Sequence, residues 1–211
     1  MTETSPSSNQ LDPVFRGQLE GLITPIVQAN GGEIVDVEWK LESGEWILRI
    51  YLEKLGALAK SMSTKEAAVT LDLCADVAKA LSPALDALEE RFPHAYNLEV
   101  SSPGVERPLK KREDFARFKG EKAKLWLLNA AKPRGVETGN GQRVIEGVIE
   151  TGGDAIVLRD GSRLFDVPFE TVDRARLVFD MGSGTKKGKP ITKGRTKHPK
   201  SDQGKHPGKQ Q

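Results

Sequence analysis

The sequence has few of the residues on which covalent chemistry and metal binding usually depend. Its 211 residues include one cysteine, Cys74, and three histidines, His94, His198 and His206. A single cysteine cannot form an intramolecular disulfide, so a disulfide-stapled secreted scaffold is excluded and a reducing compartment fits. A metal site needs several matching ligands that converge on one point, and this inventory does not supply them. We therefore expect no metal site.

Signals for membrane insertion, nucleotide binding and catalysis are also missing. No run approaches the ~18 apolar residues of a membrane span, and the first ten residues lack the apolar stretch of a signal peptide. The nearest approach to a G-x-x-x-x-G-K-[ST] phosphate loop, at 184–189, has three residues between its glycines and is followed by Pro190. Cys74 lies on an apolar helix face with no evident histidine partner. We expect a soluble, cytoplasmic protein without catalytic residues, cofactor or membrane partner.

Charge is divided unevenly along the chain. The total is 32 basic and 30 acidic residues, but the segment 182–211 holds nine Lys or Arg against one acid, Asp202, a net charge of +8. The other 181 residues carry a net charge of −6. The basic segment contains no aromatic residue, so it suits electrostatic binding to phosphates with little sequence specificity. A solubilising appendage is the alternative.

Hydrophobic periodicity predicts helices in the first half of the chain. Asp12 and Pro13 begin a helix that ends at 31–32, with Pro25 expected to kink or break its last turn. Thr70 caps a second helix, and Ser82 caps a further short helix that stops at Pro93. The residues 54–68 show no clean period and are expected to form a loop.

Strict alternation of apolar and polar residues predicts strands between these helices. Strands at 35–41 and 46–52 are expected to form an antiparallel hairpin, and a third strand lies at 96–100. The first half therefore reads α-β-β-α-β, a two-layer domain of helices on a small sheet.

From residue 118 the pattern changes to five short apolar runs separated by turn residues, at 123–128, 144–149, 155–158, 164–167 and 175–179. Such spacing is typical of a small all-β barrel, so the fold class is α+β. We predict a disordered leader at 1–10, an N-terminal α/β domain at 11–101, an interdomain connector at 102–117, the barrel domain at 118–180 and a disordered Lys-rich tail at 181–211.

The connector begins with an unusual motif. Pro103 and Gly104 suit the second and third positions of a type II turn, and Pro108 biases Arg107 away from helix. The motif consists of Ser101, Ser102, Pro103, Gly104, Arg107 and Pro108. These residues fit an ordinary interdomain turn and a functional surface equally well.

Basic residues in two segments are candidate contacts to nucleic-acid phosphates. They are Arg107, Lys110, Lys111 and Arg112 in the connector, and Lys186, Lys187, Lys189, Lys193, Arg195 and Lys197 in the tail. The net positive charge of the connector cluster is reduced by three nearby acids, Glu106, Glu113 and Asp114.

The segment YNLEVSSPGVERPL, at 96–109, resembles the signature of the bacterial ribosome maturation factor RimP family. Four further blocks resemble family blocks in the family's order: GGEIVDVEWK at 31–40, WILRIYLEK at 46–54, VTLDLCADVAKALSPALD at 69–86 and FARFKGEKAKLWL at 115–127. The resemblance covers about 11–180 and implies an N-terminal α/β domain followed by an Sm-like or SH3-like barrel.

The resemblance also implies a function. A member of this family would bind the immature small (30S) ribosomal subunit, through its RNA and proteins, and assist its late assembly without catalysis. The segment 54–68 is longer than the corresponding loop in typical members, and the Lys-rich tail is not a general family feature. The alternative is a general RNA-binding regulator built on an Sm-like barrel, which would assemble into rings. The N-terminal domain argues against ring closure, so we expect a monomer.

Overall fold

The computed structural model describes residues 11–136, 140–151 and 155–179. The leader at 1–10 and the tail at 181–211, both predicted to be disordered, lie outside the described residues. Within the described part, apolar side chains gather into two separate cores, one from each half of the chain.

The first helix, α1 (Pro13–Ala29), begins as predicted. The Asp12 carboxylate accepts hydrogen bonds from the backbone N–H groups of Val14 and Phe15, both at 3.0 Å. Pro25 lies inside the helix and does not break it, so the expected break is wrong, whereas the expected kink stays a prediction. A proline this near the end removes one hydrogen bond, and the burial of Ile23 and Val27 on either side holds the last turn in place.

The predicted hairpin is confirmed. Strands β1 (Gly32–Glu42) and β2 (Glu45–Lys54) pair antiparallel, and β3 (Tyr96–Ser101) pairs parallel to β2, giving the order β1-β2-β3. The register shifts between Ile34 and Asp36, so Asp36 and Val37 are both buried although they are neighbours. Strict alternation therefore fails at this point, because a bulge turns one residue out of phase.

The second long helix, α3 (Leu71–Asp86), has Thr70 as its N-cap, as predicted, with the hydroxyl oxygen 3.2 Å from the Leu73 nitrogen. A separate helix starting at Ser82 does not form, because α3 runs through Pro83 to its end. Buried Leu81 and Leu85 continue the apolar face of the helix across the proline. A short 3-10 helix, η1 (Glu89–Arg91), follows.

The expected loop at 54–68 contains a helical turn that the sequence analysis missed. This turn, α2 (Thr64–Ala67), begins with a capping box. The backbone N–H of Glu66 donates to the Ser63 hydroxyl, and the Glu66 carboxylate accepts from the Ser63 backbone N–H. The turn is too short for hydrophobic periodicity to reveal it.

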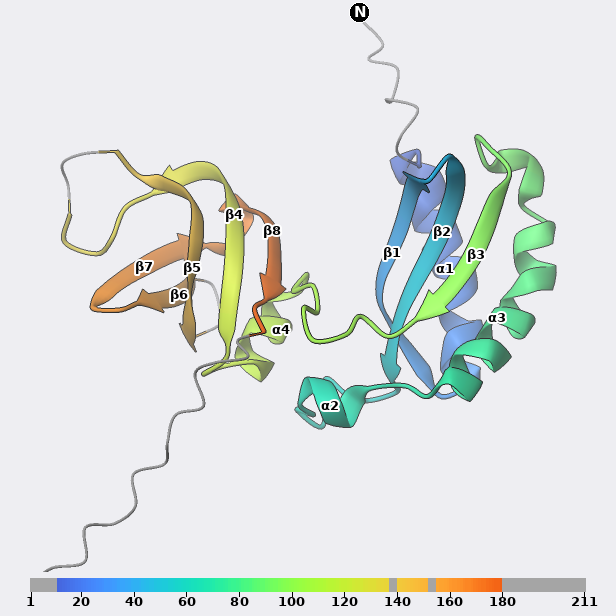
Figure 1. Ribbon diagram of the computed structural model, residues 1–211, viewed down its shortest axis with the longest axis horizontal. Coiled ribbons are helices and arrows are strands. Elements are labelled where there is room, and N and C mark those ends of the chain that lie inside the picture. The colour runs from blue at the N-terminus through green and yellow to red at the C-terminus, as the bar shows by residue number, and fades with distance from the viewer. Residues whose placement is uncertain (1–10, 137–139, 152–154, 180–211) are drawn as a thin grey trace, which may run out of the picture. The chain divides into compact units, whose positions relative to one another are not determined.

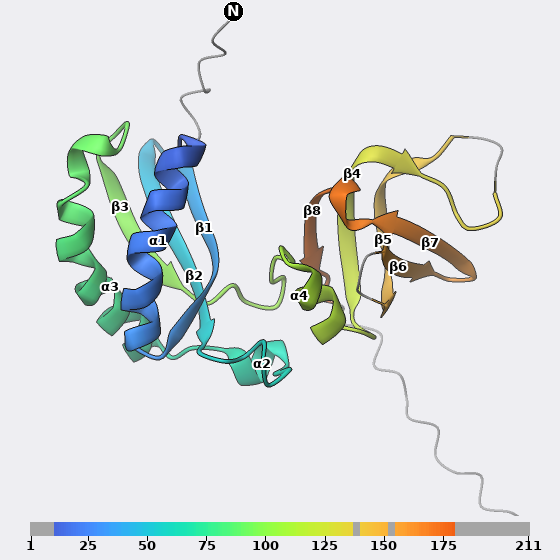
Figure 2. The same cartoon turned by 180° about the vertical axis from the view of Figure 1, so that it is seen from behind.

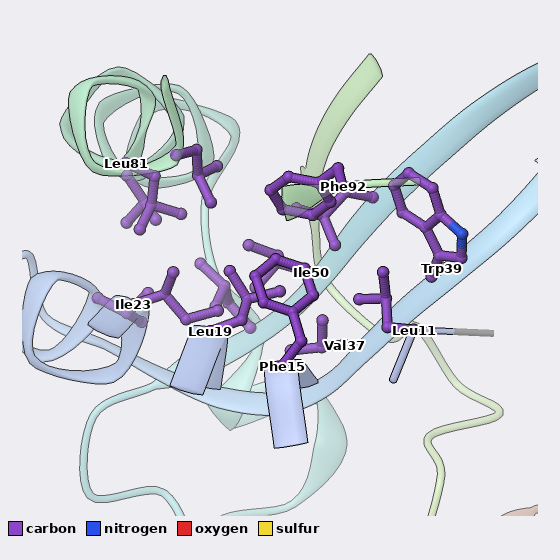
Figure 3. Packing of buried hydrophobic residues seen from close by; sticks show 14 residues of the cluster. Leu11, Phe15, Leu19, Ile23, Val37, Trp39, Ile50, Leu81 and Phe92 are labelled. Carbon is purple, nitrogen blue, oxygen red and sulfur yellow. The ribbon is translucent and has the colours of Figure 1, made fainter. Parts of the chain in front are cut away.

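Helices α1 and α3 lie on one face of the three-stranded sheet (Figure 1, and from behind in Figure 2). Their apolar faces pack on the strands, and Figure 3 shows Phe15 and Leu19 from α1, Leu81 from α3 and Ile50 from β2 converging in this core. The other face of the sheet is polar, as the alternation predicted. This half is a two-layer α/β domain, called the N-terminal domain below.

The second half forms a five-stranded antiparallel sheet in the order β7-β6-β5-β4-β8. The strands are β4 (Lys122–Ala131), β5 (Gln142–Thr151), β6 (Ala155–Asp160), β7 (Arg163–Pro168) and β8 (Val172–Leu177), with a 3-10 turn, η2 (Phe169–Thr171), before the last. All five predicted apolar runs lie wholly or largely within these strands. Among the described residues β7 and β8 are the two ends of the ladder, so a closed barrel stays a prediction. A short helix, α4 (Arg112–Arg117), precedes β4 and was not predicted.

Candidate functional site

The connector motif leaves β3 and joins the edge of the second sheet. Gly104 has φ +69°, the left-handed conformation that the type II turn requires. Further along, the Leu109 N–H donates to the Ala175 carbonyl and the Leu177 N–H donates to the Arg107 carbonyl, both at 2.9 Å. Residues 107–109 therefore extend the sheet beside β8, and this pairing stiffens the connector.

Arg107, a candidate RNA contact, is buried with 4% of its surface exposed. Its Nη2 lies 2.9 Å from Glu53 Oε1, its Nε 3.3 Å from Glu53 Oε2 and its Nη1 2.9 Å from Asp114 Oδ1. With two carboxylates at hydrogen-bond distance and almost no exposed surface, this guanidinium is committed to the protein interior. In this structure Arg107 serves the fold and does not present its charge to a phosphate.

Glu53 is the centre of this buried cluster. It also accepts from Nη1 of Arg117 on α4, at 3.0 Å to each carboxylate oxygen. The two guanidinium groups lie over the ring of Phe118, with centroid distances of 5.2 Å for Arg107 and 4.7 Å for Arg117. Buried charges are tolerated when they are paired and hydrogen-bonded. The cluster ties the end of β2 to the connector and to α4.

The Asp114 carboxylate binds two sets of donors, the Arg107 guanidinium and two backbone N–H groups. While Oδ1 faces Arg107, its Oδ2 accepts from the backbone N–H groups of Lys110 and Lys111, both at 2.9 Å. These bonds satisfy the backbone donors of the two residues that precede α4. Periodicity does not reveal Glu53, Asp114 and Arg117 as a set, because Glu53 lies 61 residues before Asp114 and all three have the pattern of ordinary surface charges.

The other basic connector residues are more exposed than Arg107. Lys110 pairs with the buried carboxylate of Asp36, and Arg112 pairs with Glu170 and lies over the Phe169 ring at 5.0 Å. Lys111 is exposed, and within the described part of the chain it forms no ion pair. The six tail residues of the candidate set lie outside the described residues. Of the connector residues, Lys111 is therefore the most available to an anionic partner.

One half-buried aromatic side chain lies on a cationic part of the second sheet. Trp126 on β4 has Arg174 and Arg176 of β8 and Lys124 beside its ring, at 4.5, 5.2 and 5.4 Å from ring centroid to cation. Arg176 pairs with Glu106 at 3.1 Å, whereas Arg174 has no carboxylate partner among the described residues. We call these four residues the Trp126 patch. The sequence analysis did not single out this patch, because the pairing of residues on neighbouring strands depends on the strand register.

The polar face of the N-terminal domain carries a dense ion-pair network. Arg49 of β2 pairs with Glu42 of β1 at 2.9 Å and with Glu99 of β3 at 2.6 Å, and Lys40 adds a second bond to Glu42 at 2.6 Å. Two hydrogen bonds, the larger effect from Arg49 and the smaller from Lys40, lower the pKa of Glu42 to about 2. The carboxylate stays ionised and paired, as in a structural network, and is not poised for proton transfer.

Features that suggest catalysis or metal binding do not emerge from the described residues. No group of three or more His, Cys, Asp or Glu side chains in that part of the chain is placed to hold a metal ion. Burial raises the pKa of Cys74, which disfavours the reactive thiolate. Among the same residues, no helix is both long and apolar enough to cross a membrane.

The comparison with protein families matches the N-terminal domain and the start of the connector. Residues 22–106 match the model of the RimP N-terminal domain. The chain contains a RimP N-terminal domain. The match runs from α1 through the three-stranded sheet to Glu106, so it includes most of the SSPGVERPL motif. The match covers 85 of the 211 residues, and the RimP family to which this domain model belongs is a family of ribosome maturation factors.

Charge separates the RimP N-terminal domain from the rest of the chain. Residues 11–101 contain 15 acidic and 8 basic residues, a net charge of −7, whereas residues 102–181 carry 15 basic and 13 acidic residues. The acidity that the sequence analysis assigned to the whole folded body therefore belongs to the RimP N-terminal domain. This domain suits a basic partner, and the second half suits an anionic one.

Proposed function

We propose that this protein binds the immature small (30S) ribosomal subunit and assists its late assembly without catalysis. The match to the RimP N-terminal domain carries the proposal. Segregated charge supports it, because a ribosomal precursor presents RNA phosphates and basic proteins side by side. Complementary fields speed such encounters and disfavour wrong orientations. We place this activity in the cytoplasm and assign it to a monomer.

The proposed RNA contacts are the exposed Lys111, the Trp126 patch and the six basic tail residues. An aromatic ring flanked by cations is suited to single-stranded RNA, since a base stacks on the ring and the cations contact phosphates. The tail adds electrostatic attraction without base recognition. Arg107 is left out of this set, because it is buried and paired with Glu53 and Asp114.

Sedimentation of a cell lysate tests the proposal. The protein should migrate with free small subunits and be absent from full ribosomes. Migration with messenger-sized RNA alone would contradict the proposal and favour the general RNA-binding regulator. Loss of the protein should also delay maturation of the small subunit, so cells that lack it and still assemble subunits at the normal rate would overturn the proposal.

The tail is tested with two variants of the full protein. One lacks residues 182–211, and the other keeps the tail length but has its nine Lys and Arg replaced by glutamine. Each phosphate contact contributes about 0.7–0.9 to the slope of log affinity against log salt. Both variants should bind small subunits more weakly, with a shallower slope and unchanged preference for the immature particle. An unchanged slope in the glutamine variant would show that the tail is a solubilising appendage.

A further inference from the structure

The N-terminal domain has a cavity of about 480 Å³ at the end of α3, away from the connector. Its lining comes from the last turn of α3, from η1 and from the start of β3. The lining includes three ring side chains, Phe92, His94 and Tyr96, and two carboxylates, Asp86 and Glu89. None of the contacts in the buried Glu53 cluster uses these residues.

The ring side chains form a wall that the core holds in place. The His94 ring stacks on Trp46 at 4.6 Å with an interplanar angle of 7°, and Trp46 stacks in turn on Trp39 at 5.1 Å. Phe92 is buried and contacts Tyr96, with ring centroids 4.4 Å apart. Because the inner rings belong to the hydrophobic core, the wall is pre-organised, and His94 forms its exposed outer layer.

The carboxylates at the cavity are in an electrostatically unfavourable position. Asp86 is the last residue of α3, where the helix dipole already places negative charge, and the last turn of the helix contains no basic residue. Glu89 and Glu90 follow within one turn. Across the described ranges, none of the three has a cationic partner, and the neighbouring Arg91 lies over the Phe15 ring instead.

The nearby Tyr96 hydroxyl shows the same negative field. Burial raises its pKa, and the charges of Asp86 and Glu89 raise it further. Local rules for helix stability would place lysine or arginine here. Two unpaired acids, Asp86 and Glu89, instead line a cavity beside a wall of rings, an arrangement that an external cation would complete.

We propose that this cavity binds the side chain of an arginine from a basic peptide segment of a partner protein. A planar guanidinium can stack on the ring wall while its N–H groups pair with the two carboxylates, which a lysine ammonium cannot do in the same way. The net charge of −7 on this domain attracts a basic segment and repels RNA. That the partner is a ribosomal protein rests on the proposed function, whereas arginine binding does not.

Fluorescence anisotropy of a labelled arginine-rich peptide, titrated with the full chain, tests the proposal. Binding should saturate, and the double variant Asp86→Asn, Glu89→Gln should weaken it about fivefold to tenfold, the effect of two exposed charge pairs. Asp72→Asn, Asp76→Asn is the matched control, because it removes two exposed charges from α3 outside the cavity. The control should change the affinity less than about twofold, since these charges act at a distance through screening salt.

Three results would overturn the proposal: an unchanged affinity in the cavity variant, an equal loss in both double variants, or equal binding of a lysine peptide of the same length and charge. Thermal melts of both variants show whether each is folded. Peptide binding that persists in a protein that does not migrate with small subunits would contradict the proposed function and leave this inference standing.

Discussion

Glu53→Ala is expected to destabilise the protein strongly, because Glu53 is the carboxylate shared by two buried arginines. It accepts from Arg107 at 2.9 and 3.3 Å and from Arg117 at 3.0 Å to each oxygen. Without it, Arg107 keeps Asp114 and the Pro108 carbonyl. Arg117 keeps one bond, to the Met62 carbonyl, and its Nη2 already has no partner.

The magnitude follows from the uncompensated charge. Removing one partner of a buried ion pair costs about 3–5 kcal/mol. Because a folded domain is stable by about 5–15 kcal/mol, this is a large fraction of the total. At about 2–4 °C per kcal/mol for a chain of this size, the melting temperature should fall by roughly 10 °C.

Thermal and urea unfolding followed by far-UV circular dichroism measure this loss. The matched control is Glu99→Ala, whose carboxylate pairs with Arg49 at 2.6 Å but has 44% of its side chain exposed. Exposed pairs contribute about 0–1 kcal/mol, so the control should change little. If Glu53→Ala loses no more stability than Glu99→Ala, the argument from burial is refuted.

Two further predictions concern single residues. Gly147→Ala in β5 would place a Cβ 2.6 Å from the Arg159 carbonyl oxygen, so it should cost about 1–3 kcal/mol in a thermal melt, whereas Gly17→Ala, with open space in α1, should stabilise by up to about 1 kcal/mol. Glu42 should titrate near pH 2 by NMR, and a midpoint near 4.5 would contradict its pairing with Arg49 and Lys40. Because its folded pKa is lowered, its contribution to stability is present above pH 4.5 and is lost as the pH falls toward 2.

The periodic spacing of hydrophobic residues and the capping residues at helix ends were enough to predict most elements of the fold. Asp12 and Thr70 begin the two long helices as caps, and the alternation around Trp39 and Trp46 predicts the hairpin. The errors cluster at Pro25 and Pro83, where local rules predicted a break. Whether a helix continues past a proline depends on the burial of the residues next to it. That burial is set by the packed core and not by the proline itself.

The candidate site was less predictable than the fold. The SSPGVERPL motif was found from its turn residues and its resemblance to the RimP family, but the same reasoning made Arg107 a candidate phosphate contact. Its partners, Glu53 and Asp114, approach from 54 residues before it and seven after it. Nothing in local pattern distinguishes a buried acid of this kind from a solvated one.

By itself the sequence determined the starts of the two long helices, the strands, the positive φ of Gly104 and the division of charge, because each depends on residues a few positions apart or on simple counts. Tertiary structure alone decided the parallel pairing of β3 with β2, the burial of Arg107 and the position of Asp86 and Glu89 beside a wall of rings. These features depend on which distant side chains come into contact and lose their water, and burial decides whether a charge binds a partner or holds the fold together.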